Sequence, residues 1–182
     1  MLYYLYYILS DIFYNGTSVN EILPNLWLGN YKTAHDINFL KENKINLILN
    51  CTPDISFIDE KIIEELKIET YRIPVNDSLL EKDIILMEDY LKIFIPLLFN
   101  KYIVEKKNIL IHCHAGKQRS AIVVAALLKV LIDKQLIKLT NRTNDQFTSI
   151  YNYLLEKRPQ VFTYGLRVNF EKSYKRFFKL DK

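Results

Sequence analysis

Chemically reactive residues lie between two strongly apolar stretches in "NILIHCHAGKQRSAIVVAALLKVL". The apolar residues before Cys113 predict a buried strand, and those after Ser120 predict a buried helix. The polar residues between them therefore form a short loop that leads into a helix N-terminus, where free backbone N–H groups bind anions. Gly116 allows a tight turn, and Arg119 can hold two oxygens of one phosphate. The stretch thus predicts a loop that binds a phosphate dianion.

Cys113 lies at the base of this loop, where it can act as a nucleophile. A positive potential lowers the pKa of a thiol, and the thiolate is its reactive form. A thiolate beneath a bound phosphate can attack the phosphorus in line and form a cysteinyl phosphate. We expect Ser120 to donate a hydrogen bond to the sulfur, and His112 to be a buried orienting residue rather than a base. The residues expected to bind the phosphate are His114, Ala115, Gly116, Lys117, Gln118 and Arg119.

The pattern His112-Cys113-x-x-Gly116-x-x-Arg119-Ser120 resembles the signature of the cysteine-dependent protein tyrosine phosphatase superfamily. The next residue, alanine, and the short chain resemble the dual-specificity branch. The flanking strand and apolar helix make the match far more specific than a bare Cys-x5-Arg. The structural alternative is a buried cysteine and a surface arginine at chance spacing. The resemblance implies a cysteinyl-phosphate mechanism that needs no cofactor.

The family's mechanism also needs an acid to protonate the leaving oxygen and then a base to activate water. "TYRIPVNDSLLEKDI" resembles the family segment in which a strand leads to a loop aspartate, and Asp77 matches that aspartate. Asp83 and Asp89 fall on the next predicted helix and are weaker candidates. A turn or capping residue is the structural alternative for Asp77.

The resemblance extends over most of the chain. "EILPNLWLGNYKTA" and "INLILNCTPD" are similar to the family's first two strands, and "LLEKRPQVFTYGLRVNFEKSYKRF" to its closing helices. Departures are Pro96, the tyrosine-rich first 16 residues, and the lack of a Pro-Asn pair before the last glycine. Arg158 is assigned a supporting role. Most buried cysteines only fill space, but Cys51 ends a strand beside the loop, where some relatives have a cysteine that forms a reversible disulfide with the nucleophile.

The substrate class follows from chain length and from the loop. The chain leaves no room for the recognition loop that deepens the pocket of classical tyrosine phosphatases, so a phosphoprotein substrate carrying phosphotyrosine, phosphoserine or phosphothreonine is expected. Lys117 in "HAGK" resembles phosphoinositide phosphatases, which keeps a lipid or other non-protein phosphomonoester as an alternative. RNA 5′-triphosphatases lack the aspartic acid, so Asp77 argues against them. A catalytically weak phosphoprotein-binding module is a further alternative, although such modules usually lack the cysteine or the arginine.

Short apolar runs alternate with longer helical patterns along the chain. This alternation predicts a single-domain α/β fold, with a central, mostly parallel, twisted sheet of four to five strands flanked by helices. Pro96 should kink or break its helix, while Ser78-x-x-Glu81 and Thr143-x-x-Gln146 are candidate capping boxes. Strands are expected at residues 25–28, 47–51, 70–75 and 108–112, and helices at 33–44, 58–66, 82–101, 120–134, 143–157 and 166–179.

Composition excludes several classes of function. The formal net charge of the 182-residue chain is +4, too mild for the basic stripe of a nucleic-acid-binding protein. Two cysteines cannot form a disulfide framework, so the cytoplasm or another reducing compartment is expected. Three scattered histidines and two cysteines give no zinc spacing, so no metal is expected. No apolar run is long enough to insert stably across a membrane.

The first 16 residues, "MLYYLYYILSDIFYNG", are apolar but lack the features of a signal peptide. They predict an N-terminal helical extension over residues 1–18, followed by a catalytic domain over residues 19–182. This layout resembles the dual-specificity phosphatases of poxviruses and other large DNA viruses, some of which dimerise through such a helix. The resemblance implies a homodimer and, for a viral chain, the host cytoplasm or the virion. Packing on its own domain is the alternative for this helix, and a membrane surface is the least favoured one.

Overall fold

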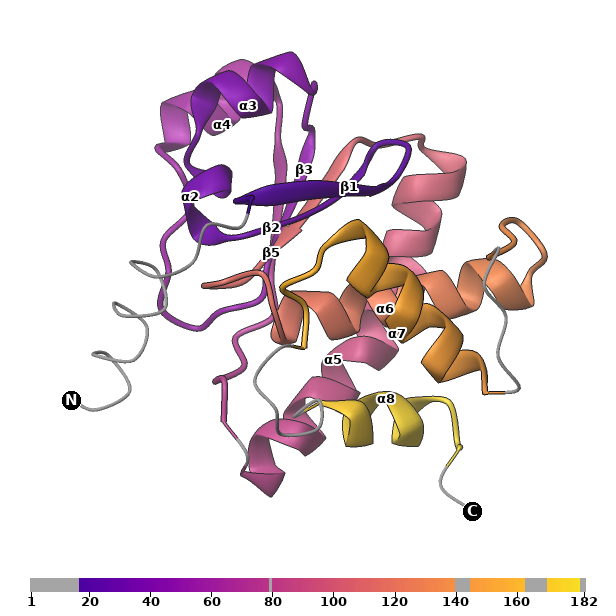
Figure 1. Ribbon diagram of the computed structural model, residues 1–182. Coiled ribbons are helices and arrows are strands. Elements are labelled where there is room, and N and C mark those ends of the chain that lie inside the picture. Colours follow the sequence, from indigo (N-terminus) through magenta and orange to yellow (C-terminus); the bar gives the residue numbers. More distant parts are fainter. Residues whose placement is uncertain (1–16, 79, 140–144, 163–169, 181–182) are drawn as a thin grey trace.

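A five-stranded sheet in the order β1-β2-β5-β3-β4 forms the centre of the molecule (Figure 1). This computed structural model describes residues 17–78, 80–139, 145–162 and 170–180. Strand β1 runs antiparallel to β2, and all the other pairs are parallel. The predicted single-domain α/β fold is therefore confirmed. The strands are β1 (Val19–Leu23), β2 (Leu26–Gly29), β3 (Leu47–Asn50), β4 (Glu69–Arg72) and β5 (Ile109–His112).

Helices cover both faces of the sheet (Figure 1). Because successive side chains of a strand point to opposite faces, Ile109 and Ile111 of β5 belong to the larger core and Leu110 to the smaller one. Burial on both faces explains why the central strands are apolar without alternation. One face carries α2 (Tyr31–Ala34), α3 (Ile37–Glu42) and α4 (Glu60–Leu66), and the other carries α5 (Glu81–Phe99), α6 (Arg119–Asp133), α7 (Gln146–Lys157) and α8 (Glu171–Phe177).

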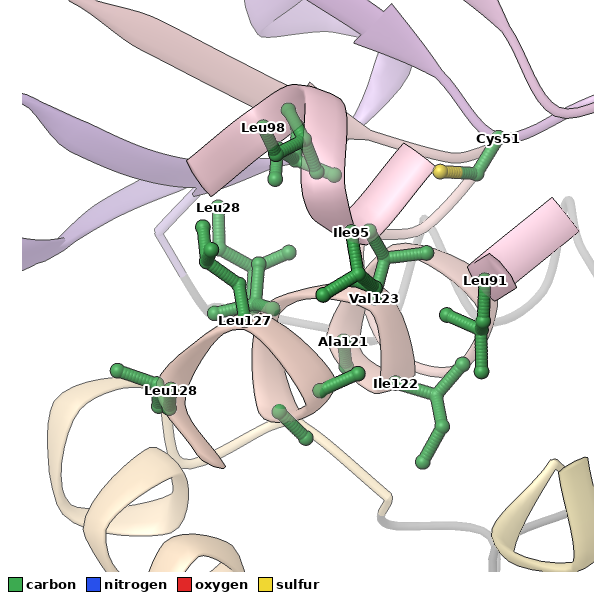
Figure 2. Close-up of a cluster of buried hydrophobic side chains, with 14 of the residues drawn as sticks. Leu28, Cys51, Leu91, Ile95, Leu98, Ala121, Ile122, Val123, Leu127 and Leu128 are labelled. Carbon is green, nitrogen blue, oxygen red and sulfur yellow. The ribbon is translucent and has the colours of Figure 1, made fainter. Parts of the chain in front are cut away.

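Helix α6 is the buried central helix that the sequence predicted. All its side chains from Arg119 to Leu131 are buried except that of Val130, which is partly exposed. Figure 2 shows apolar side chains of α6 packed with those of α5 and with Leu28 of β2. Burial of a single large aliphatic side chain stabilises a fold by about 1.5–3 kcal/mol. This packing therefore fixes the start of α6 rigidly against the end of β5.

The first strand of the sheet was missed by the sequence analysis. Residues Pro24 and Asn25 form the turn of a β1–β2 hairpin, whereas Asn25 was expected to begin a strand. Asn25 has a φ of 67°, which asparagine tolerates better than most residues. Only Ile22 of β1 is buried, so this edge strand has little apolar pattern to recognise.

Two helix predictions differ in detail from the structure. The helix expected over residues 33–44 is divided into α2 and α3, since the Asp36 carboxylate accepts a hydrogen bond from the N–H of Phe39 and starts a new helix. Pro96 was expected to kink or break its helix, and it does not break it. Helix α5 continues through it to Phe99, and a π-helical segment, η1 (Asn100–Val104), follows.

Neither candidate capping box provides the N-cap residue of its helix. The box at Ser78 does not form, because the N-cap of α5 is Leu80, which makes no side-chain capping bond. At α7 the N-cap is Asp145, whose carboxylate accepts from the N–H groups of Phe147 and Thr148. Thr143, the first part of the last predicted helix, and the N-terminal 16 residues lie outside the described residues. Within the described part of the chain, no helix has both the length and the hydropathy to cross a bilayer.

Candidate active site

The loop between β5 and α6, residues 113–118, lies at the carboxyl end of a central strand of the sheet. Strand β5 lies between β2 and β3 and is parallel to both. Ligands of open α/β sheets bind at this edge. Helix α6 has no side-chain capping bond from its N-cap residue, Gln118, and a helix N-terminus favours a bound anion. We call residues 113–119 the phosphate loop.

Gly116 allows the phosphate loop to lie directly against the end of β2. Its φ is +67°, and a Cβ atom there would lie 2.4 Å from the carbonyl oxygen of Gly29 and 2.8 Å from Nη2 of Arg158. Any side chain would therefore force the loop away from its support. The glycine that the sequence analysis assigned to a tight turn is required both for the turn and for this contact.

Arg158 supports the phosphate loop from behind. The side chain is 1% exposed, and its Nε and Nη2 donate to the carbonyl oxygens of Gly116 and Ala115 at 2.9 and 3.4 Å. The C=O and N–H of a trans peptide point in opposite directions. Holding these carbonyls on one side therefore turns the N–H groups of Gly116 and Lys117 to the other, and the N–H of Gly116 lies 3.3 Å from Sγ of Cys113. Arg158 thus has the supporting role expected of it.

Cys113 is buried and surrounded by groups that stabilise a thiolate. Ser120 Oγ donates to Sγ at 3.2 Å, as the sequence analysis expected. Burial raises the pKa of the Cys113 thiol, but the Arg119 guanidinium and the Ser120 hydrogen bond outweigh it, and the net pKa is lowered. The geometry therefore favours the nucleophilic form of this cysteine.

Arg119 and Asp77 come together beside the loop although they lie far apart in the sequence. Arg119 is 4% exposed, and its Nη2 lies 3.6 Å from Oδ2 of Asp77. Its Nη1 donates to the carbonyl oxygen of Val75 at 3.2 Å. Arg119 therefore fixes one end of the segment that carries Asp77, and this candidate acid lies within a few ångströms of the guanidinium expected to bind phosphate.

His112 is buried behind Cys113, the candidate nucleophile. Its Nδ1 lies 3.3 Å from the carbonyl oxygen of Cys113, and because a carbonyl only accepts, Nδ1 carries the proton. Burial lowers the pKa of His112 to about 4. The imidazole is therefore neutral near pH 7, which agrees with an orienting role rather than with a base that gains a proton.

The burial of His112 predicts a loss of stability in mild acid. Its folded pKa of about 4 lies below the ordinary value of 6.5, so the unfolded chain takes up the proton first. The stabilisation is complete above pH 6.5 and disappears as the pH falls toward 4. Between pH 7.5 and pH 5 we expect the free energy of unfolding to fall by about 2 kcal/mol through this group. Urea titrations should show a smaller fall for His112→Gln, and equal falls in both proteins would contradict the assignment.

The remaining loop residues are held by their main chains. The carbonyl of His114 accepts from the N–H of Tyr31 at 3.2 Å, and the two rings are 5.0 Å apart. The carbonyl of Lys117 accepts from the N–H of Phe162 at 3.0 Å. Lys117 and Gln118 have buried side chains, at 6% and 3% exposure. Tyr31 was missed by the sequence analysis, because a tyrosine after a strand carries no signal of its own.

Cys51 lies next to Cys113, since the two residues follow the neighbouring strands β3 and β5. Asn50 of β3 pairs with His112 of β5, and the N–H of Cys51 donates to the carbonyl of His112 at 2.7 Å. Figure 2 shows Cys51 at the margin of the buried cluster. Burial and the neighbouring Cys113 raise the pKa of the Cys51 thiol well above its ordinary value, and Arg119 opposes them. Two thiols with opposite pKa shifts are therefore neighbours.

Comparison with known proteins agrees with this geometry. The model of the family "Dual specificity phosphatase, catalytic domain" matches residues 26–163. Human dual specificity protein phosphatase 16 is 30% identical over 162 residues, which cover 85% of this chain and 21% of that protein. Dual specificity protein phosphatase 22 of Xenopus tropicalis is 30% identical over 118 residues, which cover 65% of this chain and 51% of that protein. The chain thus spans a fifth to a half of the length of these relatives.

Solved structures share the fold. Human DUSP28 has a TM-score of 0.65 and 15% identity, with 90% of this chain and 95% of that chain covered. OH1 from the Orf virus has a TM-score of 0.65 and 16% identity, with both chains covered completely. The family match includes the whole phosphate loop and Asp77, and it confirms the resemblance seen in the sequence. The chain belongs to the dual-specificity phosphatase family of the cysteine-dependent protein tyrosine phosphatase superfamily.

Proposed function

We propose that the protein is a dual-specificity protein phosphatase, which hydrolyses phosphotyrosine and phosphoserine or phosphothreonine through a cysteinyl-phosphate intermediate. The observation that carries this proposal is the surroundings of buried Cys113. Its Sγ accepts hydrogen bonds from Ser120 Oγ at 3.2 Å and from the N–H of Gly116 at 3.3 Å, and its pKa is lowered in spite of burial. A structural cysteine in a core has the opposite shift, as Cys51 does. Family membership supports the same activity.

In the first step, the Cys113 thiolate attacks phosphorus and forms an S–P bond while the bond from phosphorus to the ester oxygen breaks. Arg119 and the inward N–H groups of the loop bind the three non-bridging oxygens, and Asp77 gives its proton to the leaving oxygen. In the second step, Asp77 takes a proton from water, and the water oxygen attacks phosphorus. The S–P bond breaks, phosphate leaves, and the hydrogen bond from Ser120 stabilises the thiolate.

Two features favour a phosphoprotein substrate with this chemistry over the alternatives. The phosphoinositide alternative depended on Lys117 as an added cation, but its side chain is 6% exposed and offers little surface to further phosphates. The binding-module alternative is disfavoured because Cys113, Arg119 and Asp77 are all present and close together. Catalysis without metal is consistent with a cysteine nucleophile.

A peptide that carries both phosphothreonine and phosphotyrosine tests the proposal. We expect the wild type to release phosphate from both residues without added metal, and Cys113→Ser to release none. Release from phosphotyrosine alone would overturn dual specificity while leaving the cysteine mechanism. A folded wild type that releases nothing from the peptide, but does so from a phosphoinositide, would overturn the protein-substrate assignment.

Cys51 is proposed as a reversible redox partner of Cys113. Peroxide oxidises the Cys113 thiolate to a sulfenic acid and releases hydroxide, and Cys51 then attacks that sulfur, loses its thiol proton and forms a disulfide as water leaves. Dithiothreitol should restore activity to the peroxide-treated wild type but not to Cys51→Ser. Peptide mapping should find a Cys51–Cys113 bond. Detection of overoxidised Cys113 without that disulfide would contradict the proposal.

Assembly and location complete the proposal. A thiolate nucleophile needs a reducing compartment such as the cytoplasm to stay active. The homodimer through residues 1–18 also stays a proposal. Light scattering of the chain with and without residues 1–16 tests it: a mass that falls by half on deletion supports the dimer, and an unchanged mass contradicts it.

A further inference from the structure

We propose that Asp83 is a positioning residue, which holds the segment around Asp77 in place for proton transfer. This inference rests on the proposed function and concerns how its acid is oriented. Asp83 lies in the first turn of α5 and is 3% exposed. A buried carboxylate is costly unless polar partners compensate for its lost hydration, so its contacts identify what it does.

Both carboxylate oxygens of Asp83 bind residues next to Asp77. Ser78 Oγ donates to Oδ2 of Asp83 at 2.5 Å, and Asn76 Nδ2 lies 3.4 Å from Oδ1. Asn76 and Ser78 are the immediate neighbours of Asp77 on its two sides. The N–H of Ser78 also donates to the carbonyl of Asn76 at 3.0 Å, which closes a tight turn around Asp77. One buried side chain therefore holds both flanks of the candidate acid.

This use of Asp83 departs from what an acidic residue in a first turn ordinarily does. Such residues bind the free N–H groups of their own helix or complement its dipole. The N-cap residue of α5, Leu80, has no capping side chain, and its N–H donates to Ser78 Oγ at 3.1 Å rather than to Asp83 at the third position of the helix. The carboxylate is directed to the preceding loop instead. Because the carboxylate binds both neighbours of Asp77, it indicates a role in that loop.

The first turn of α5 is a firm base for this contact. Ser173 of α8 is fully buried, and its Oγ donates to the carbonyl of Ile84 at 2.7 Å. Arg176 of α8 binds the carboxylate of Glu81 at 2.5 Å. Asp83 lies between these two anchored residues, so its position is fixed by the packing of α8 on α5.

The segment that carries Asp77 is thus held at both ends. Arg119 holds Val75 on the side of the phosphate loop, and Asp83 holds Asn76 and Ser78 on the side of α5. A general acid must lie within hydrogen-bonding distance of the ester oxygen. Without Asp83, the Asp77 carboxyl would lose its fixed position, while the nucleophile and the phosphate ligands would keep theirs. We therefore expect kcat to fall only for substrates whose hydrolysis is limited by proton transfer to the leaving group.

Two aryl phosphates that differ in their leaving group separate this role from general damage. Para-nitrophenyl phosphate has a good leaving group that needs little acid assistance, and phenyl phosphate has a poor one. We expect Asp83→Ala to lower kcat for phenyl phosphate about tenfold and to leave that for para-nitrophenyl phosphate within about twofold. Asp83→Asn keeps an acceptor for Ser78 and should recover most of the activity. Asp89→Ala removes an exposed carboxylate of the same helix and serves as the matched control.

A double-mutant cycle with Asp77 completes the test. Asp77→Asn should lower kcat for phenyl phosphate about 100-fold, and Asp83→Ala should add less than about twofold in that background. Equal losses on both substrates, or a full tenfold loss in the Asp77→Asn background, would overturn the inference. If Asp83→Ala unfolds, Ser78→Ala removes one of the two contacts and should give a smaller loss of the same selectivity. A wild type inactive on para-nitrophenyl phosphate would reject the proposed function itself, and the inference with it.

Discussion

The Cys113→Ser variant should lose turnover of every phosphate monoester, by about 10⁴-fold or more, while it still binds phosphate. A serine hydroxyl is a far weaker acid than a thiol whose pKa the site lowers, so the nucleophile is lost. The phosphate ligands do not depend on the sulfur. Arg158 holds the loop carbonyls and Gly116 packs on Gly29, and both contacts persist in the variant. The variant should therefore keep its affinity for phosphate while it loses catalysis.

Steady-state kinetics and calorimetric titration with inorganic phosphate check this separation. The matched control is Cys51→Ser, which makes the same chemical change in the neighbouring buried thiol. It should retain turnover under reducing conditions, because the raised pKa of Cys51 keeps it protonated at rest. Residual turnover in Cys113→Ser within about tenfold of wild type would exclude Cys113 as the nucleophile. An equal loss in Cys51→Ser would indicate damage to the loop instead.

The sequence predicted the phosphate loop well because everything that defines it is local. Strand β5 and helix α6 are buried on nearly all sides, so their apolar residues contrast sharply with the polar loop. Cys113, Arg119 and Ser120 lie within a few residues of one another, and a strand and a helix leave that short loop few ways to join them. The spacing of Cys113 and Ser120 was therefore enough to predict their contact. In the structure, Ser120 Oγ lies 3.2 Å from Sγ of Cys113.

The parts that the sequence did not predict depend on contacts between distant segments. Arg158 binds the carbonyl of Gly116, which lies 42 residues before it, and no local pattern encodes that pair. Asp83 was correctly placed on a helix, but its burial depends on how α8 fixes the first turn of α5. Strand β1 was missed because an edge strand needs only one buried residue, Ile22. Position in the fold, rather than residue type, gives these groups their roles.

Arg119→Lys should be nearly as severe as loss of the nucleophile, although it keeps the charge. We expect kcat/KM to fall by about 10³-fold, because a lysine ammonium is a point charge and cannot hold two phosphate oxygens in one plane. The guanidinium also donates to the carbonyl of Val75 and lies 3.6 Å from Asp77, so its loss frees the segment that carries the acid. The phosphate contact, the position of Asp77 and the pKa of Cys113 therefore all depend on the Arg119 side chain.

The pH dependence of kcat/KM distinguishes these contributions. A lysine at position 119 preserves a positive charge, so the acidic limb, which reports the Cys113 thiol in the free enzyme, should move little. The plateau should fall, and the loss should be greater for phenyl phosphate than for para-nitrophenyl phosphate because the acid is also displaced. Arg72→Lys is the control, since Arg72 donates to the carbonyl of Thr52 at 2.7 Å without touching the loop. A plateau within about tenfold of wild type would show that charge, rather than the planar fork, is what the phosphate requires.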